Sequence, residues 1–135
     1  MILVDANVLL DVIGDDPQWA DWSTAQLDTW SVRGDLLINP VIYAEIAPAF
    51  DAIETLEGTV AAMDLEFEPL PREALFLAGH AHLVYRRRGG TRPGVLPDFF
   101  IGAHASVRRL PVLTRDARRY RFYFPALRLV TPDPL

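Results

Sequence analysis

The sequence predicts a three-layer α/β fold in which helices flank a mostly parallel, twisted sheet. Short apolar runs typical of buried strands alternate with longer amphipathic segments typical of helices. Hydrophobic residues make up 50% of the chain and charged residues 23%, which is the balance of a globular protein. At this length of 135 residues, we expect one domain that spans residues 1–135.

The first half of the chain predicts strands and helices in alternation. Asn7 is a candidate N-cap for a first helix that ends at Gly14. Asn39 followed by Pro40 is typical of a helix start. The expected strands are 1–5, 36–38 and 65–68, and the expected helices are 8–13, a segment between Pro17 and Gly34, 41–50 and 52–63.

The second half continues the alternation around a loop rich in glycine and proline at 89–97. A long helix precedes this loop, and the helix after it carries the apolar run Phe99-Phe100-Ile101. The expected helices are 71–87, 98–108 and 115–120, and the expected strands are 112–113 and 127–130.

Four acidic residues have apolar neighbours and invite a functional explanation: Asp5, Glu45, Asp98 and Asp116. Burying an unpaired carboxylate costs several kcal/mol, so such acids usually have a partner. Ligands of parallel sheets bind beyond the carboxyl ends of the strands, and Asp5 and Asp116 each follow a predicted strand. Glu45 and Asp98 are expected near helix starts on the same side, so one cation shared at this rim would pair all four.

Three of these acids also fit a simpler role. Asp5, Asp98 and Asp116 each lie at the start of a predicted helix, where aspartate is favoured as a cap. Glu45 lies inside a predicted helix among apolar neighbours, and capping does not explain it.

A site of several carboxylates suits Mg²⁺, with Mn²⁺ as a substitute, rather than zinc. We expect Asp5 and Asp98 to bind the ion directly, because magnesium takes only one or two carboxylates and keeps several waters. Glu45 and Asp116 would then act through water or on a second ion. Two such ions can activate water and stabilise the leaving oxygen of a phosphoryl displacement.

Two neutral side chains complete the candidate site. The hydroxyl of Thr114 is expected to orient a bound water or the Asp116 carboxylate. The amide of Asn7 is expected to hold Asp5 by a hydrogen bond, as partners of metal ligands commonly do.

The candidate residues lie in four segments, residues 4–8, 41–46, 96–105 and 113–116. These segments resemble the motifs of PIN domains, and more narrowly those of VapC toxins of type II toxin–antitoxin modules. This resemblance implies a Mg²⁺-dependent endoribonuclease with a PIN-like fold, which cleaves RNA phosphodiesters by metal-activated water. It also implies a cognate VapB-like antitoxin that blocks the site, and it favours a homodimer. The acidic quartet of the family maps onto the four acids above, its hydroxyl onto Thr114 and its amide onto Asn7.

The charge is divided unevenly along the chain. Residues 1–83 hold fifteen acidic residues and two arginines, whereas residues 84–135 hold eleven arginines and three acidic residues. The basic part is typical of a surface that binds phosphate or an acidic peptide, although the two halves would also neutralise each other in the fold. Arg86–Arg88 and Arg115–Arg121 are therefore candidate contacts for RNA or for an antitoxin.

Other features are expected to be structural. Asp11 is predicted to be solvated or paired, and His80, His82 and His104 are predicted to be structural or surface residues. The apolar helices near 19–30 and 44–63 would support a homodimer, with the antitoxin on part of the same face.

Several alternatives remain open at this point. The same fold would serve a nuclease for DNA or for RNA processing, and a module that binds RNA or metal without cleaving is the non-enzymatic alternative. A receiver-like domain is disfavoured because the chain has no lysine, and a haloacid dehalogenase-type phosphatase because Asn7 replaces its second aspartate. No cysteine is present, no apolar run approaches the ~20 residues of a membrane span, and no signal peptide is predicted. We therefore expect a cytoplasmic protein that does not contact membranes.

Overall fold

The computed structural model describes residues 1–132 and contains a five-stranded sheet with the strand order β3-β2-β1-β4-β5. All neighbouring strands run parallel, which confirms the predicted α/β class. The strands are β1 Ile2–Val4, β2 Leu36–Ile38, β3 Leu65–Phe67, β4 Val112–Leu113 and β5 Leu129–Val130.

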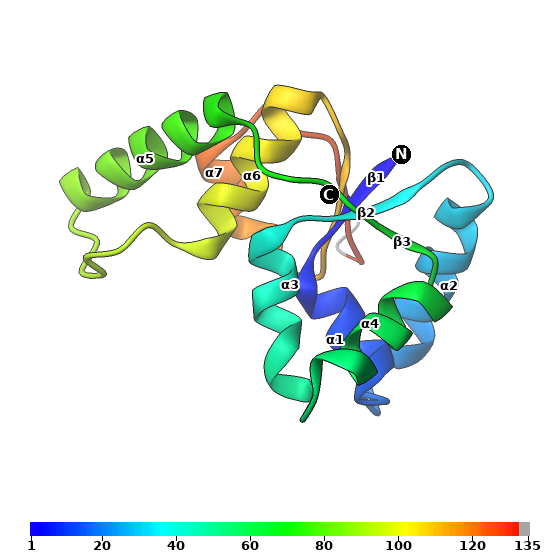
Figure 1. Ribbon diagram of the computed structural model, residues 1–135. Helices are drawn as coiled ribbons and strands as arrows, with labels where there is room; N and C mark the ends of the chain where they lie inside the picture. Colours follow the sequence, from blue (N-terminus) through cyan, green and yellow to red (C-terminus); the bar gives the residue numbers. More distant parts are fainter. Residues whose placement is uncertain (133–135) are drawn as a thin grey trace.

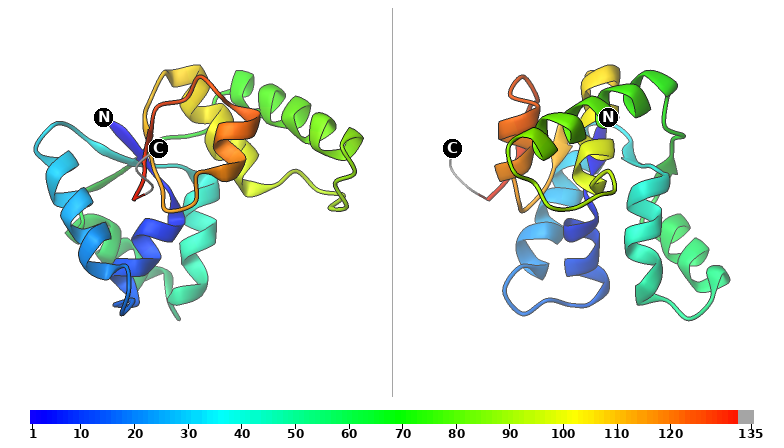
Figure 2. Two further views of the ribbon diagram at one scale, coloured as in Figure 1. Left: turned by 180° about the vertical axis from the view of Figure 1, so that it is seen from behind. Right: turned by 90° about the vertical axis from the view of Figure 1, so that its left-hand side faces the viewer.

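Helices cover the sheet on both sides. Helix α1 packs against α2 and α3, and α6 packs against α3, α5 and α7. In Figure 1, α1 to α4 gather below the strands, while α5, α6 and α7 lie above and to one side, and the views in Figure 2 agree. Within residues 1–132, no helix is long and apolar enough to cross a membrane. The helices are α1 Ala6–Ile13, α2 Ala20–Ser31, α3 Pro40–Ile46, α4 Ile53–Ala62, α5 Arg72–Arg87, α6 Pro97–Arg108 and α7 Arg118–Tyr123, with a 3₁₀ turn at Ala47–Ala49.

The predicted N-cap of the first helix is wrong. Asp5, not Asn7, caps α1, and its Oδ1 accepts a hydrogen bond from the backbone N–H of Ala6 at 2.8 Å. The chain enters the helix directly after β1, so Asn7 already lies within its first turn. The capping alternative for Asp5 is therefore correct, and its other contacts decide whether capping is its whole role.

Two other helix boundaries differ from prediction. Helix α3 ends at Ile46 rather than near residue 50, because Pro48 has no N–H to continue the helical hydrogen bonds. Helix α7 begins at Arg118 rather than at residue 115, because a turn in which the Thr114 hydroxyl accepts from the N–H of Asp116 comes first.

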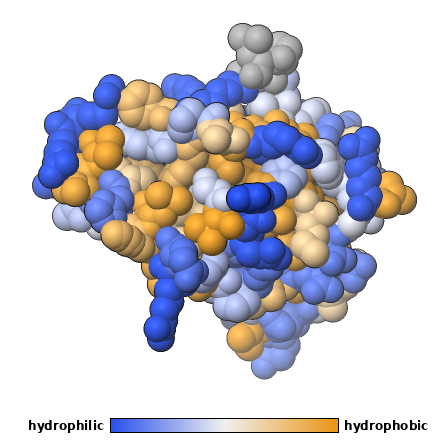
Figure 3. All heavy atoms as spheres, turned by 90° about the horizontal axis from the view of Figure 1, so that it is seen from above, coloured by the Kyte–Doolittle hydropathy of each residue, from blue (hydrophilic) through white to orange (hydrophobic). Residues whose placement is uncertain are grey.

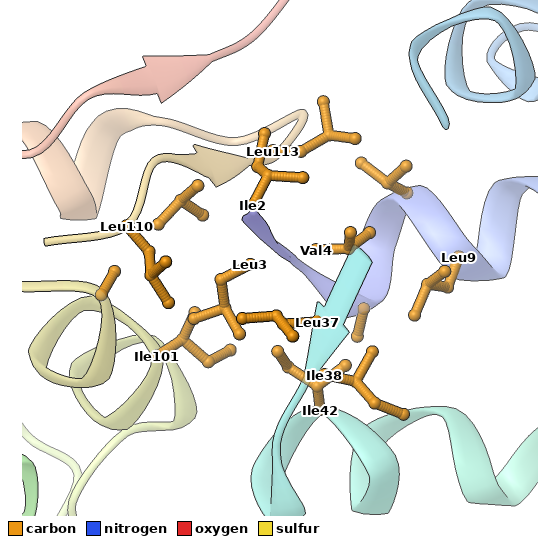
Figure 4. Packing of buried hydrophobic residues seen from close by; sticks show 14 of the residues in the cluster. Ile2, Leu3, Val4, Leu9, Leu37, Ile38, Ile42, Ile101, Leu110 and Leu113 are labelled. Carbon is orange, nitrogen blue, oxygen red and sulfur yellow. The ribbon is translucent and has the colours of Figure 1, made fainter. Parts of the chain in front are cut away.

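The core lies around the two central strands. Every residue of β1 is fully buried, and β2 is nearly so, as expected for parallel strands covered on both faces. Figure 4 shows β1 and β2 side chains packed with Ile101 of α6 and Ile42 of α3. This packing fixes the positions of α3 and α6, which carry Glu45 and Asp98.

The topology creates a switch point between β1 and β4. The chain leaves β1 towards β2 and β3 on one side, and it returns to β4 and β5 on the other. The N–H of Asp5 donates to the carbonyl oxygen of Leu113 at 2.9 Å, which joins the carboxyl ends of β1 and β4. Such a point is the usual ligand-binding position of open α/β sheets.

Candidate functional site

Asp5 lies at the centre of the site and is nearly fully buried. In addition to capping α1, its Oδ2 accepts from the hydroxyl of Thr114 at 2.9 Å and from that of Tyr120 at 2.8 Å. Burial raises the pKa of Asp5 to about 6; the charge of Asp98 also raises it, and the hydrogen bonds from Tyr120 and Thr114 oppose the rise. These three hydrogen bonds fix the orientation of the Asp5 carboxylate at the switch point.

Thr114 and Asn7 form a chain of hydrogen bonds that leads to Asp5. The Nδ2 of Asn7 donates to Thr114 Oγ1 at 3.2 Å, and its Oδ1 accepts from the N–H of Arg115 at 3.1 Å. Asn7 therefore acts on Asp5 through Thr114, and the direct bond that we expected does not form. Thr114 likewise contacts the backbone of Asp116 rather than its carboxylate.

Glu45 lies in the last turn of α3, not near a helix start as predicted. Its Oε1 is buried, and residues 1–132 offer it no hydrogen-bond partner. Burial raises the pKa of Glu45 to about 7, and the charges of Asp5 and then Asp98 add to the rise. Asp5, which follows β1, therefore shares one electrostatic environment with Glu45 of α3 and Asp98 of α6.

Asp98 and Asp116 form the outer edge of the site. Asp98 lies in the first turn of α6, and its Oδ2 accepts from Nη1 of Arg119 at 3.2 Å. Burial raises the pKa of Asp98, Arg119 opposes the rise, and the charge of Asp116 supports it. Asp116 is 65% exposed and lies 3.7 Å from Nε of Arg118, so of the four acids it is the one most open to solvent.

Sequence reasoning missed Tyr120, which stands 115 residues from Asp5 and hydrogen-bonds to it. Its ring is buried, and burial together with the charges of Asp5, Asp98 and Glu45 raises its pKa well above the ordinary value. The phenol therefore stays protonated and donates to Asp5. Its position within an arginine-rich segment gives no sequence signal for this role.

The donor set fits a hard divalent cation. Glu45 Oε1 is a buried oxygen to which residues 1–132 offer no hydrogen-bond partner, and the charges of Asp5 and Asp98 reach it and add to the rise of its pKa. Residues 1–132 contain no ready-made cluster of three or more Asp, Glu or His around one point. Magnesium does not need one, because it uses one or two carboxylates and retains waters.

We predict that Glu45→Gln stabilises the metal-free protein near pH 8. Because the folded-state pKa of Glu45 is raised, its contribution to stability is fully present below its unfolded value of 4.5 and is lost as pH rises through about 7. Glutamine removes that loss, which we expect to be on the order of 1–2 kcal/mol after allowance for partial solvation. Thermal melts in EDTA measure it.

The same melts near pH 5 should show a much smaller difference, since most Glu45 is then protonated in the wild type. Glu66→Gln, on the exposed side of β3, is the matched control and should leave the melting temperature unchanged. A Glu45→Gln protein that melts below wild type near pH 8 would show that the carboxylate is stabilising and contradict the electrostatic account.

A second buried network holds α3 against α6. His104 is fully buried; its Nδ1 lies 3.1 Å from Nδ2 of Asn39, and its Nε2 lies 2.6 Å from Oε2 of Glu68. Since the Asn39 amide donates to Nδ1, the ring proton is on Nε2 and points to Glu68. Asn39 also caps α3, and Arg108 donates to both oxygens of Glu68, which lowers the pKa of Glu68 to about 2. The structural role predicted for His104 is confirmed.

Arg115 pairs with Asp11 rather than facing the site. Its Nε and Nη2 donate to the two carboxylate oxygens of Asp11 at 2.6 and 2.9 Å, and its guanidinium lies over the ring of Trp19. Ser23 donates to the same carboxylate. The predicted pairing of Asp11 is confirmed, and the predicted phosphate contact by Arg115 is not supported.

An open pocket of about 500 Å³ adjoins the outer acids. It brings together acidic, basic and aromatic side chains from the end of α5, the start of α6 and the segment around α7. Its lining residues are Arg88, Asp98, Asp116, Arg118, Arg119, Phe122 and Tyr123. Part of the predicted basic surface therefore borders the candidate metal site.

Comparison with known proteins identifies both a family and a fold. Residues 2–125 match the PIN domain. No curated protein sequence matches significantly.

Several solved structures share the fold over nearly the whole chain. The crystal structure of VapBC2 from Rickettsia felis, bound to a DNA fragment from its promoter, contains a chain with a TM-score of 0.74 and 17% identity, with 98% of this chain and 100% of that chain covered. DNA-bound VapBC from Salmonella typhimurium gives a TM-score of 0.71 and 20% identity, covering 97% and 98%. FitAcB from Neisseria gonorrhoeae gives 0.69 and 22%, with full coverage of both chains.

Proposed function

Because the chain belongs to the PIN domain family, a family of nucleases, we propose that it is a metal-dependent endoribonuclease and the toxin of a type II toxin–antitoxin module. The single observation that carries the metal-dependent chemistry is the carboxylate set of Asp5, Glu45 and Asp98, in which the buried Glu45 Oε1 has no partner among residues 1–132. The similar chains come from complexes named VapBC and FitAB, which supports the toxin role. We propose that this PIN domain spans residues 1–135.

We propose Mg²⁺, with Mn²⁺ as a substitute, as the cofactor. Glu45 and Asp98 would hold the ion most directly, because the oxygens of Asp5 already accept three hydrogen bonds. Asp5 would add charge at close range, and Asp116 would act from the exposed edge. This order differs from our sequence-based ranking, in which Asp5 and Asp98 came first.

The remaining residues have positioning roles. Thr114 and Tyr120 fix the direction of the Asp5 carboxylate, and Asn7 holds Thr114 in place. Arg119 donates to Asp98 and lines the adjoining pocket, so it would lie beside a phosphodiester bound there. When bound, a divalent cation would activate water for attack on phosphorus and stabilise the charge that develops on the leaving 3′ oxygen.

The proposal is tested by incubating purified protein with single-stranded RNA in Mg²⁺, in Mn²⁺ and in EDTA. We expect cleavage with either metal and none in EDTA, and restored cleavage when excess Mg²⁺ is added back. Cleavage in EDTA would contradict the metal-dependent mechanism. Binding of RNA without cleavage under every condition would favour the alternative of a non-catalytic binding module.

A nuclease for DNA or for RNA processing is the second candidate, because a metal ion held by carboxylates can act on the phosphodiester bonds of DNA and of RNA alike. Single-stranded DNA of the same sequence, added in parallel, separates these substrates. Growth arrest on expression, relieved by a protein from an adjacent reading frame, separates a toxin from a processing enzyme. We propose the cytoplasm as its location, because the proposed RNA substrates lie there.

Partner surfaces are proposed from exposed apolar side chains. The predicted dimer helix near 19–30 is a weak candidate, since Trp22 and Trp30 pack against the core. Helix α5 is a better one, because Phe76, Leu83 and Val84 are exposed on it. Figure 3 shows apolar atoms gathered over the side of the molecule that α5 occupies. We propose α5 for a homodimer.

We propose a different surface for the VapB-like antitoxin. An apolar pocket of about 490 Å³ lies between α3, α4 and β3, and Tyr43, Val60 and Phe67 are among its lining residues. It overlaps the 44–63 region that the sequence indicated. An apolar antitoxin segment in this pocket would lie close to α3, which carries Glu45.

A further inference from the structure

The pocket beside Asp98 and Asp116 contains an aromatic and cationic surface that the metal chemistry does not use. Phe122 is 50% exposed, although it lies on a short helix whose other aromatic residues pack inward. The guanidinium of Arg88 lies 4.2 Å from the centre of the Phe122 ring. The two groups come from α7 and from the end of α5, so the fold builds this pair from distant segments.

This pair is braced against the core of the site. The ring of Tyr123 packs edge-on against Phe122, with 4.7 Å between the ring centroids, and against Phe99, with 4.8 Å between the centroids. Phe99 is fully buried and directly follows Asp98 in α6. The position of Phe122 is therefore coupled through two rings to the backbone that carries an acid of the candidate metal site.

The charges of the pocket suit a phosphate backbone next to the acids. Arg119 reaches Asp98 from one side of the pocket, and the side chain of Arg118 is 92% exposed beside Asp116. Phosphates of a strand crossing the acids would meet these guanidinium groups, and Arg binds phosphate oxygens through a planar fork.

We propose that Phe122 and Arg88 form a stacking platform for an unpaired RNA base next to the cleaved phosphodiester, with Arg118 on an adjacent phosphate. Single-stranded RNA is bound in this way, by stacking of bases on aromatic rings and on guanidinium planes beside cations. An acidic peptide would use the arginines but has no need of the exposed ring. A pocket of about 500 Å³ is within the range that holds a small ligand such as one nucleotide. The inference rests on the proposed nuclease function and names the part of the substrate that this pocket binds.

The test measures binding in EDTA, so that it does not depend on cleavage. Fluorescence anisotropy of a labelled single-stranded RNA should show that Phe122→Ala weakens binding by about 5- to 150-fold, the range for loss of one stacked base. Phe122→Leu keeps apolar volume against Tyr123 without a ring and should show a similar loss. Arg88→Lys keeps the charge but not the plane and should also weaken binding.

Trp30→Ala is the matched control, because the guanidinium of Arg33 lies 5.0 Å from the centre of the Trp30 ring, but Trp30 does not line the pocket beside Asp98 and Asp116. It should bind RNA as the wild type does. An abasic strand of the same length should bind wild type and Phe122→Ala equally. Equal losses for Phe122→Ala and Trp30→Ala, an unchanged affinity of both Phe122 variants, or the same loss on the abasic strand would each overturn the platform.

The two proposals fail separately. Phe122-dependent RNA binding in a protein that never cleaves RNA in Mg²⁺ would support the platform and contradict the nuclease. Metal-dependent cleavage, with unchanged RNA binding and unchanged kcat/KM in both Phe122 variants, would support the nuclease and overturn the platform.

Discussion

Asp98→Asn should abolish RNA cleavage, with a loss of at least about 100-fold in kcat/KM, since even partners of metal ligands typically contribute 10–100-fold. Asp98 is the acid that links all parts of the site. It lies in the first turn of α6, its charge contributes to the raised pKa of both Asp5 and Glu45, and it borders the pocket that would hold the substrate. Asparagine has nearly the same shape, so the change removes charge rather than volume. Cleavage of labelled RNA in Mg²⁺ measures the effect.

The loss must be separated from unfolding. Asp98 is partly exposed, and its ion pair with Arg119 is also partly exposed, so we expect the variant to lie within about 1 kcal/mol of wild-type stability. Asp28→Asn changes the net charge equally on the exposed face of α2 and should cleave normally. Cleavage at the wild-type rate by a folded Asp98→Asn protein would remove Asp98 from the site.

Metal binding gives the same variant a readout that does not depend on RNA. Mg²⁺ should raise the melting temperature of the wild type near pH 8, because a ligand that binds only the folded state stabilises it. The increase should be much smaller for Asp98→Asn and for Glu45→Gln. It should also shrink near pH 5, since protons then compete with the ion for acids whose pKa values are raised.

The architecture was predictable because its signal is local. The apolar runs of β1 and β2 are too short for helices, and helices between them require parallel strands. The end of α3 at Ile46 was within reach too, since Pro48 marks it. The start of α7 could not be predicted, because the turn before it is held by Asn7, which lies far away in the sequence. Asn7 donates to Thr114 Oγ1 and accepts from the N–H of Arg115.

The candidate acids could be singled out from the sequence, but their geometry could not. Apolar neighbours marked the four acids, yet only the tertiary structure shows that Glu45, Asp5 and Asp98 share one environment while Asp116 lies at its exposed edge. The contacts of Tyr120 could not be foreseen, because tyrosine in an arginine-rich segment is equally typical of a surface. The roles of the individual arginines could not be predicted either, because each role depends on which acidic residue that arginine contacts in the fold.

Of these arginines, Arg115 has the largest expected effect on stability. Arg115→Met should lower the free energy of unfolding by about 3–5 kcal/mol, because it leaves Asp11 as an uncompensated buried charge. Asp11 is 3% exposed, and its carboxylate accepts both donors of the Arg115 fork as well as the hydroxyl of Ser23. Urea denaturation measures the loss, and Arg72→Met, at the exposed start of α5, is the control for losing an arginine.

A second change distinguishes a lost ion pair from a general packing defect. Asp11→Asn keeps an acceptor for Ser23 but removes the charge, so the double variant Arg115→Met with Asp11→Asn should recover most of the stability. The Arg115→Met variant and the double variant should both lose little RNA affinity once folded, because Arg115 pairs with Asp11 and lies over Trp19 in the wild type. A stable Arg115→Met protein with weakened, salt-sensitive RNA binding would instead return Arg115 to the phosphate-binding surface. That surface would then extend from the α7 pocket across the end of β4 to α1, and α1 would contact the substrate.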